Sequence, residues 1–453
     1  MEITADTIAA IATGTGGAIT VIRISGPDAL HISNSFWRGH KNLSRENPRT
    51  MLLGKCASSD GLFSEQAIAV FFSAPNSYTG ENIVEIQCHG GTLVSRKVLE
   101  LCLRAGARQA NPGEFTFRAF MNGKIDLTQA EGVAEIISAQ SSMALNLAER
   151  QARGIIGKTV REIRKTLVFV LSECESRLDF GEENLDWTSP DELNARLGES
   201  SGKIAGLLKY KTEGAILREG IRIVIAGKPN VGKSSMLNLL LGYDRAIVTH
   251  LPGTTRDTVE EHAVIRNIPV RLIDTAGIRD ADDLIENKGI ERSLASLKQA
   301  QLVLWILDPC SDLQSEIGTM KSHLRSSDCS IAVWNKTDLV KDTHLLPGTG
   351  IDTVKVSVEK NTGIEELLDV IEKKAWGHPH NEEPELAVSS RHATLLEDAD
   401  EAIPGAVSTI SDQNWELAAV HLRSAISSLG KITGEDASPD ILDDIFSRFC
   451  IGK

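Results

Sequence analysis

The chain has no closely spaced cysteines, no long apolar run and no excess of positive charge. Its seven cysteines stand singly, without a C-x-x-C pair or a paired His/Cys spacing, so neither a disulfide framework nor a structural zinc site is expected. No apolar run nears the roughly 18 residues of a membrane span. The first 14 residues lack the charged start and apolar core of a secretory signal. These absences predict a cytoplasmic protein with no membrane segment.

The balance of charge is acidic. The 48 Lys and Arg residues are outnumbered by 62 Asp and Glu residues, which gives a formal net charge of −14. A protein that binds nucleic acid by itself usually has an excess of positive charge, so any contact of this chain with RNA needs a local basic patch or a second protein. The 453 residues are several times the common domain length, and we therefore expect two to four domains.

The sequence pattern changes along the chain. Residues 1–120 alternate short β-rich runs with turn clusters, which predicts a compact α+β domain. Residues 121–215 carry apolar positions at helical spacing, and this pattern returns in 376–453. Residues 216–375 alternate strands with helices, as in a parallel sheet with crossover helices. We expect an α/β domain inserted into an all-α helical domain.

The strongest motif is a phosphate-binding loop. The segment Gly227–Ser234 fits G-x-x-x-x-G-K-S, follows an apolar strand and precedes a predicted helix. In such a loop, backbone N–H groups face phosphate oxygens, Lys233 reaches the β- and γ-phosphates, and Ser234 offers its hydroxyl to Mg²⁺. The residues expected to bind phosphate are Asn230, Val231, Gly232, Lys233, Ser234 and Ser235.

Later motifs predict that the nucleotide is GTP. The sequence N-K-T-D ends a predicted strand, and its Asp338 carboxylate can accept two N–H bonds from guanine that adenine does not offer. The sequence D-T-A-G ends another strand and places Asp274 near the metal. The residues expected at the nucleotide from these motifs and from the last strand are Asp274, Thr275, Ala276, Gly277, Asn335, Lys336, Asp338, Ser357 and Val358.

A switch segment is predicted between the phosphate-binding loop and Asp274. Thr255 is assigned there as a second Mg²⁺ ligand. The residues of this segment expected near GTP are Thr249, His250, Leu251, Pro252, Gly253, Thr254 and Thr255.

The residue after the D-T-A-G motif is unusual. Ile278 stands where Ras-like enzymes have the glutamine that orients the attacking water. A carboxylate within hydrogen-bond reach of the water could serve instead. The charged candidates in the following loop are Arg279, Asp280, Asp282, Asp283 and Glu286.

With three further segments, these motifs resemble one family. The opening Asp6–Ala10, the run from Pro112 to Leu127 and the end Phe449–Lys453 are similar to the bacterial tRNA modification GTPase family MnmE, also called TrmE. The likeness covers essentially the whole chain. It implies an N-terminal α+β domain that binds folate and dimerises, a helical domain built from two separate stretches, and an inserted Ras-like P-loop GTPase domain.

The resemblance also implies an activity and partners. In the family, GTP hydrolysis accompanies modification of the wobble uridine of certain tRNAs at carbon 5, to aminomethyl or carboxymethylaminomethyl products. The FAD-containing partner MnmG, also called GidA, takes part, and a homodimer joined to MnmG as a heterotetramer is implied. The alternative is a GTP-dependent switch or ribosome-assembly factor with no modification chemistry.

Roles for individual GTPase residues follow from the same resemblance. Glu286 matches the glutamate that orients water, which raises it above its acidic neighbours, and Lys233 is the expected catalytic lysine. A bound K⁺ would supply positive charge where other GTPases use an arginine finger. The implied K⁺ ligands are Asn230, Thr249, Leu251 and Thr254.

The resemblance implies a second site, for 5-formyl-tetrahydrofolate or a related folate. Its implied residues are Arg23, Glu85, Lys124 and Lys453. A carboxylate suits the N–H edge of a pterin, and cations suit the glutamate tail. Cys450 taken alone is interpreted as a buried apolar thiol, whereas the resemblance makes it a residue required for modification. The loop Gly14–Gly17 is one residue shorter than the family pattern.

Overall fold

The computed structural model describes residues 6–180, 186–243, 260–274, 300–324, 329–340, 346–376 and 385–453. The chain divides into two compact units. One contains the residues up to 134 together with 151–204 and 394–453, and the other contains 135–150 and 205–393. Among the described residues, no helix is long and apolar enough to cross a membrane.

The first unit begins with a seven-stranded sheet in the spatial order β3-β4-β5-β6-β2-β1-β7. Neighbouring strands are antiparallel except for β1 and β7, which run parallel. The strands are β1 (Ile8–Ile11), β2 (Ile19–Ser25), β3 (Trp37–Gly39), β4 (Leu52–Ala57), β5 (Ser64–Phe72), β6 (Ile83–His89) and β7 (Arg108–Gln109).

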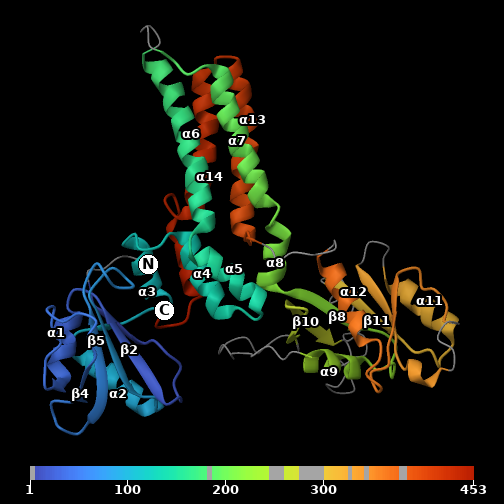
Figure 1. The fold of residues 1–453 in the computed structure, drawn as a ribbon, viewed down its shortest axis with the longest axis horizontal. Helices are drawn as coiled ribbons and strands as arrows, with labels where there is room; N and C mark the ends of the chain where they lie inside the picture. The colour runs from blue at the N-terminus through green and yellow to red at the C-terminus, as the bar shows by residue number, and fades with distance from the viewer. Residues whose placement is uncertain are drawn as a thin grey trace, which may run out of the picture. The chain divides into compact units, whose positions relative to one another are not determined.

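Helices α1 (Ala29–Phe36) and α2 (Thr92–Arg104) pack on this sheet (Figure 1). Ile22 and Ile24 of β2 and Ile86 of β6 are fully buried, because alternate residues of a strand face the same side. The α+β prediction for this region is confirmed. The two-residue strand β7 and the short strand β1 were missed, since their sequences are too short to show a period of two.

The C-terminal end of the chain packs against α3 in one apolar cluster. Helix α3 (Glu114–Met121) lies beside α15 (Pro439–Ser447), and the fully buried Phe446 ring lies edge-on to Phe117 with the ring centroids 5.3 Å apart. Phe449 stacks on Phe446 with the ring centroids 5.7 Å apart. The end of the sequence thus completes a core begun more than three hundred residues earlier.

The helical part contains α4 (Leu127–Ser138), α5 (Ser142–Ala152), α6 (Ile155–Asp179), α7 (Pro190–Leu208), α13 (Ser390–Ser411) and α14 (Trp415–Thr433). The long helices α6 and α14 lie side by side (Figure 1). Val160, Ile163 and Leu167 of α6 are fully buried at the spacing that makes one helix face. The all-α prediction is confirmed for both stretches of sequence.

The second unit contains a six-stranded sheet in the order β13-β12-β11-β8-β10-β9. The strands are β8 (Ile221–Ala226), β9 (Glu260–Ile265), β10 (Ile268–Asp274), β11 (Leu302–Leu307), β12 (Ser330–Trp334) and β13 (Asp352–Lys355). The predicted parallel sheet is present, but the edge strand β9 is antiparallel to β10. β9 is antiparallel because it and β10 form a tight hairpin at Arg266 and Asn267, whose positive φ angles suit a two-residue turn.

Helices cover both faces of this sheet. They are α8 (Lys211–Glu219), α9 (Lys233–Tyr243), α11 (Leu313–His323) and α12 (Ile364–Trp376), with a short 3-10 helix η1 (Thr337–Leu339). Leu304 and Ile306 of β11 pack in the cluster that includes α9 and α12 residues, while Trp305 packs in the cluster under α11. All six side chains of β11 are therefore buried, as expected for a central parallel strand.

Candidate functional site

The phosphate-binding loop is formed by a sharp turn after β8. Gly227 has φ +143°, and a Cβ there would lie 2.4 Å from the Ile306 carbonyl oxygen of the next strand. Gly232 has φ +99°, and its Cβ would lie 2.3 Å from the Asn335 side-chain nitrogen. Only glycine fits both positions. The loop can therefore lie close to β11 and to the N-K-T-D segment before α9 begins at Lys233.

Two lysine ammonium groups hold the loop. Lys233 donates from Nζ to the Lys228 carbonyl oxygen at 2.8 Å, so its charge lies over the loop where phosphates are expected. Lys336 donates from Nζ to the Asn230 carbonyl oxygen at 2.8 Å and to Asp308 Oδ2 at 2.7 Å. Asn230 has φ +64°, a left-handed conformation that asparagine tolerates better than most residues.

Side chains of the N-K-T-D segment connect the phosphate-binding loop with the segment that follows β13. Asn335 is 3% exposed and donates from Nδ2 to the Val231 carbonyl oxygen at 2.9 Å. Its Oδ1 accepts the Val358 N–H at 3.3 Å, and the Asp338 carboxylate accepts the Ser357 hydroxyl. These contacts bring the first, third and last nucleotide motifs together at the carboxyl ends of β8, β12 and β13.

Several predicted residues lie outside the described part of the chain. Asp274 is described only as the last residue of β10, where it pairs with Ile225 of β8. The predicted residues outside the described ranges are Thr249, His250, Leu251, Pro252, Gly253, Thr254, Thr255, Thr275, Ala276, Gly277 and Glu286.

A second polar site lies in the first unit. Arg23 of β2 and Glu85 of β6 are directly opposite in the sheet and form an ion pair with 2.8 Å between Nη2 and Oε1. The Arg23 guanidinium also lies over the rings of Tyr78 and Phe115, 5.5 and 5.6 Å from their centroids. Both charges are mostly buried, so the pair is held in one geometry by its neighbours.

The end of the chain docks beside this pair. The Phe115 N–H donates to the Lys453 carbonyl oxygen at 3.2 Å, and Ile451 bridges to Pro112. Gly452, at φ +97°, passes so close to β1 that a Cβ would lie 2.3 Å from the Ile11 carbonyl oxygen. Cys450 is exposed, so its interpretation as a buried apolar thiol was wrong.

Contacts in this region connect the residues predicted to bind folate, some directly and some through a neighbouring residue. Arg23 contacts Glu85 directly and reaches the Lys453 backbone through Phe115. Lys124 is tied to the segment that carries Tyr78, because its Nζ donates to the Pro75 carbonyl oxygen at 3.0 Å. Tyr78, half-exposed and hydrogen-bonded to Thr116, is a residue of this site that sequence reasoning missed. A lone tyrosine in a turn gives no signal that it faces an arginine.

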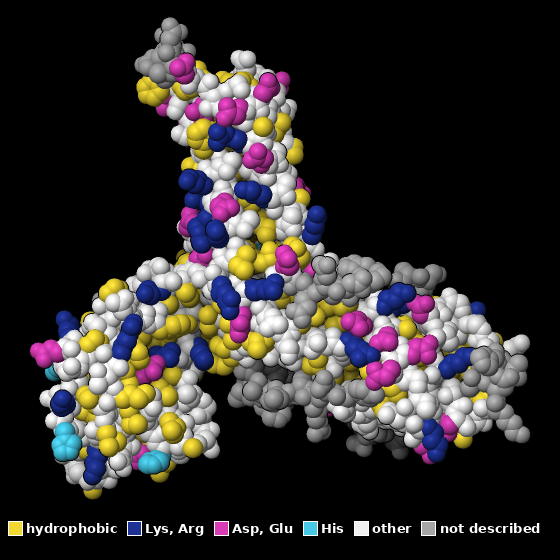
Figure 2. Space-filling view, in the orientation of Figure 1, with side chains coloured by type: hydrophobic (Ala, Val, Ile, Leu, Met, Phe, Trp, Pro, Cys, Tyr) yellow, Lys and Arg dark blue, Asp and Glu magenta, His cyan; other side chains and the backbone are white. Residues whose placement is uncertain are grey.

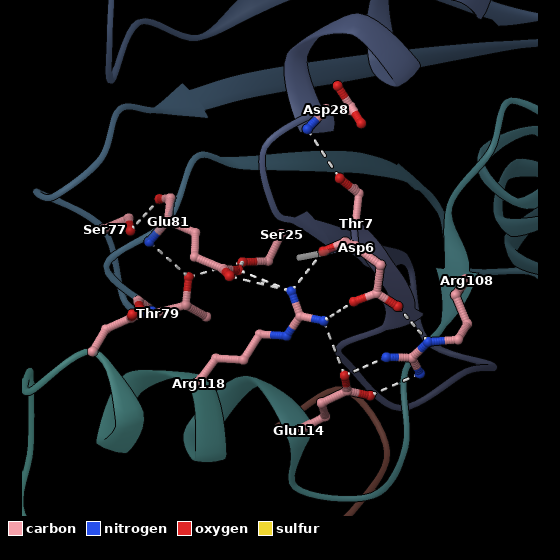
Figure 3. Close-up of polar contacts among 11 residues, drawn as sticks. Asp6, Thr7, Ser25, Asp28, Ser77, Thr79, Glu81, Arg108, Glu114 and Arg118 are labelled. Atoms are coloured by element: carbon pink, nitrogen blue, oxygen red, sulfur yellow. Dashed lines mark hydrogen bonds and ion pairs between the residues drawn. The ribbon is translucent and has the colours of Figure 1, made fainter. Parts of the chain in front are cut away.

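A buried charge network fixes the start of α3. Figure 3 shows Arg118 between Asp6, Glu81 and Glu114, and its side chain is only 5% exposed. Nη2 donates to Asp6 Oδ1 at 2.6 Å and to Glu114 Oε1 at 3.0 Å, while Nη1 donates to Glu81 at 3.2 Å. Arg108 binds both oxygens of Glu114 from the other side. The network therefore ties the start of the described chain to α3 and to the turn before β6.

Glu114 is the central acceptor of that network. Burial alone raises the pKa of its carboxyl group, but hydrogen bonds from Arg108, the Asn111 N–H and Arg118 outweigh this effect, and the pKa is lowered. Glu114 also immediately precedes Phe115, which contacts Arg23 and Lys453. The network thus supports the residues that hold the end of the chain, although the sequence marked Glu114 only as part of a family-like segment.

Comparison with protein families matches both parts of this architecture. Residues 7–124 match the family described as "GTP-binding protein TrmE N-terminus", and residues 127–450 match "MnmE helical domain". The second match alone spans more than half of the chain and includes the inserted nucleotide site.

Curated relatives match along the full length. The tRNA modification GTPase MnmE of Aquifex aeolicus is 40% identical over 449 residues, which are 98% of this chain and 99% of that protein. The protein of the same name from Geobacter sulfurreducens is 41% identical over 453 residues, 99% of each chain. The similarity therefore extends across both compact units.

Among solved structures, the chain is similar to the G domain of the T. maritima FeoB iron transporter. That chain is 28% identical, and the match covers 34% of this chain and 98% of that one at a TM-score of 0.25. Aquifex aeolicus Era bound to GDP and aluminium fluoride is 24% identical, and that match covers 40% of this chain and 66% of that one at a TM-score of 0.28.

Three features define a P-loop GTPase: the glycine-containing loop after a parallel strand, the lysines that hold this loop, and the N-K-T-D segment beside it. This GTPase domain is inserted in a helical domain that follows an α+β domain. The full-length matches specify it further. The chain belongs to the MnmE family of tRNA modification GTPases.

The assignment of Asp338 to guanine predicts a change of base preference. Asp338→Asn removes the carboxylate acceptor, and losing hydrogen bonds to a charged group lowers GTP affinity by about 10- to 100-fold. Competition between GTP and xanthosine triphosphate for the protein measures the preference. Asp312→Asn, which keeps a helix-capping side chain on α11, is the control and retains the GTP preference. An unchanged GTP preference in Asp338→Asn rejects the assignment.

The lowered pKa of Glu114 predicts a pH-dependent loss of stability. Because the folded pKa is below the unfolded value of about 4.3, Glu114 stabilises the fold above that pH and loses this effect as the pH falls through the folded pKa. Glu114→Gln costs about 1–3 kcal/mol at pH 7, since Arg108 and Arg118 lose charged acceptors. The difference in thermal unfolding midpoint between Glu114→Gln and the wild type therefore shrinks as the pH is lowered from 7 into the range below about 4.3.

The control for this comparison is the surface carboxylate Glu100, which pairs with Lys97 on α2. Glu100→Gln leaves the unfolding midpoint nearly unchanged, because exposed ion pairs contribute little. A constant difference between Glu114→Gln and the wild type at every pH contradicts the charge argument.

Proposed function

We propose that the protein is a K⁺-dependent GTPase that, with the FAD-containing partner MnmG (GidA), modifies carbon 5 of the wobble uridine of certain tRNAs. The modification uses a tetrahydrofolate one-carbon unit and yields aminomethyl or carboxymethylaminomethyl products. Family membership supports this activity. The observation that carries it is the docking of Cys450–Lys453 on α3, beside the Arg23–Glu85 pair. A GTPase that acts only as a switch has no need for this arrangement.

The proposal assigns one role to each part of the sequence. Residues 1–120 bind folate and form the homodimer, 216–375 bind and hydrolyse GTP, and 121–215 with 376–453 form the helical domain. The Phe446 cluster supports this assignment, because it ties the last residues of the chain to Phe117 of the proposed folate domain.

GTP and Mg²⁺ would be held by the residues that the loop geometry favours. Gly227 and Gly232 let the loop turn tightly between β8 and α9, and the Lys233 ammonium group donates to the Lys228 carbonyl oxygen of the same loop. Ser234 at the start of α9 supplies an oxygen ligand for Mg²⁺, and Thr255 is proposed as the second. Asp338 would recognise guanine from the opposite side.

Hydrolysis is proposed to use K⁺ and Glu286. A K⁺ bound by Asn230, Thr249, Leu251 and Thr254 would stabilise charge that develops on the phosphates, in place of an arginine finger. The support from geometry is the left-handed backbone of Asn230, whose carbonyl oxygen is held by Lys336. Glu286 would orient the attacking water in place of the glutamine that Ile278 replaces.

Folate is proposed to bind at Arg23, Glu85, Lys124 and Lys453. The Glu85 carboxylate can accept N–H bonds from a pterin edge, and the lysines can bind carboxylates of the glutamate tail. The Tyr78 ring adds an aromatic surface at the same place. Cys450, exposed at the edge of this site, is proposed to act in the modification.

Recognition of tRNA is proposed to depend on MnmG in a heterotetramer with the homodimer. The net charge of −14 disfavours strong autonomous binding to phosphates. Figure 2 shows that Lys and Arg side chains on the visible face of the long helices are interspersed with Asp and Glu. The partner would therefore contribute much of the affinity.

The K⁺ proposal predicts a strong dependence on the monovalent cation. GTP hydrolysis by the full-length protein is at least about tenfold faster in KCl than in NaCl of the same ionic strength, because removal of one charge-stabilising group typically lowers the rate by that amount or more. Asn230→Ala loses the difference, whereas Lys321→Met on the exposed side of α11 keeps it. Equal rates of GTP hydrolysis in KCl and NaCl contradict the proposed K⁺ site, although the protein would still be a GTPase.

The proposed role of Cys450 predicts a separation of activities. Cys450→Ser hydrolyses GTP at the wild-type rate and shows a normal thermal shift with 5-formyl-tetrahydrofolate, since the residue is exposed and its backbone contacts remain. tRNA from cells that depend on this variant lacks the carbon-5 modification, as measured by nucleoside mass spectrometry. Cys310→Ser, at another exposed thiol, is the control. Normal tRNA from Cys450→Ser rejects a chemical role.

A further inference from the structure

Lys228, the second residue of the phosphate-binding loop, is held by a helix outside the nucleotide motifs. Its Nζ donates to Ser315 Oγ at 2.8 Å and pairs with Glu316 Oε1 at 3.0 Å. Both partners lie in the first turn of α11, which begins after the capping residue Asp312. The side chain thus connects the loop to a helix that contributes no residue to phosphate, metal or base in the site described above.

Glu316 is a buried carboxylate, with only 2% of its side chain exposed. A buried charge is strongly unfavourable unless an opposite charge and hydrogen bonds compensate it. Lys228 supplies the opposite charge, and the backbone N–H of Asp308 approaches Glu316 Oε2 at 3.5 Å. The position of Glu316 therefore constrains both the phosphate-binding loop and the residue that follows β11.

A second ion pair closes the connection. Asp308 Oδ2 accepts from Lys336 at 2.7 Å, and the same ammonium donates to the Asn230 carbonyl oxygen. The sequence segment Lys228–Asn230 is thus held at both ends by two lysines and two carboxylates, whose formal charges balance. Asn230 has a left-handed backbone, and the hydrogen bond from Lys336 to its carbonyl oxygen holds it there.

We propose that Glu316 is a positioning residue of the GTP site. Through Lys228 it fixes the first half of the phosphate-binding loop, and so the backbone N–H groups of that loop stay directed at the phosphates in the free protein and in the complex. A preorganised set of donors holds a nucleotide longer than one that must be ordered on binding. The helix α11 thereby controls how long GDP remains bound after hydrolysis.

The proposal is tested by the release of N-methylanthraniloyl-GDP from the full-length protein, followed by stopped-flow fluorescence. Glu316→Gln, which keeps the side-chain volume, releases the nucleotide about tenfold faster, the size of change that coupled neighbouring residues commonly produce. Lys228→Met and the double variant Lys228→Met/Glu316→Gln release it equally fast, because all three variants lose the same ion pair between Lys228 and Glu316. Effects that multiply in the double variant overturn the proposal.

Thermal unfolding separates positioning from stability. Lys228→Met has the lowest unfolding midpoint, since it leaves the Glu316 carboxylate buried and unpaired, and the double variant recovers most of that loss. Release stays fast in the double variant although stability returns. If release instead slows as stability returns, or if Glu316→Gln releases GDP at the wild-type rate, Glu316 has only a structural role.

A matched control comes from the other edge of the same sheet. Glu365 of α12 is exposed and pairs with Arg266 in the β9–β10 turn. Glu365→Gln removes an ion pair between a helix and a loop without touching the phosphate-binding loop, and its GDP release rate stays at the wild-type value. If Lys228→Met does not fold, Ser315→Ala tests the same connection, because it removes the other acceptor of Lys228. GDP release at the wild-type rate in both Ser315→Ala and Glu316→Gln overturns the proposal.

Discussion

A charge that leaves water must find a partner, and this constraint organises both compact units. In the first unit, Arg118 is nearly inaccessible and can exist there only because Asp6, Glu81 and Glu114 converge on it. In the second, the buried Glu316 carboxylate requires Lys228. Each network joins segments that are far apart in the sequence and includes a residue next to a proposed site. Glu114 precedes Phe115, which contacts Arg23, and Lys228 belongs to the phosphate-binding loop. The requirement for charge pairing therefore also sets the geometry of these sites.

The proposed sites also depend on glycines that let the backbone lie against neighbouring segments. Gly227 and Gly232 allow the phosphate-binding loop to pass within contact of β11 and the N-K-T-D segment, and Gly452 allows the end of the chain to cross β1. In all three places a Cβ would collide with a neighbouring atom, so the sites depend on the absence of a side chain as much as on the charged groups nearby.

Sequence patterns predicted the elements with long or continuous signals. The strands β8 and β11 were expected at their observed bounds, because central parallel strands are apolar throughout. The four-residue strand β1 was missed because so few residues carry its pattern, and the edge strand β9 was missed because it begins with the polar residues Glu260, Glu261 and His262. The Arg23–Glu85 pair was implied only by family resemblance, since no local pattern shows which strands become neighbours.

The sequence by itself determined the nucleotide class, the order of the motifs and the family, because these depend on residue types at fixed short spacings that chemistry requires. It also determined that an α/β segment interrupts a helical one. Only the tertiary structure decided that Phe446 and Lys453 complete the N-terminal region and that α11 braces the phosphate-binding loop. Those contacts join residues separated by tens to hundreds of positions, and they follow from packing and charge pairing that no local spacing encodes.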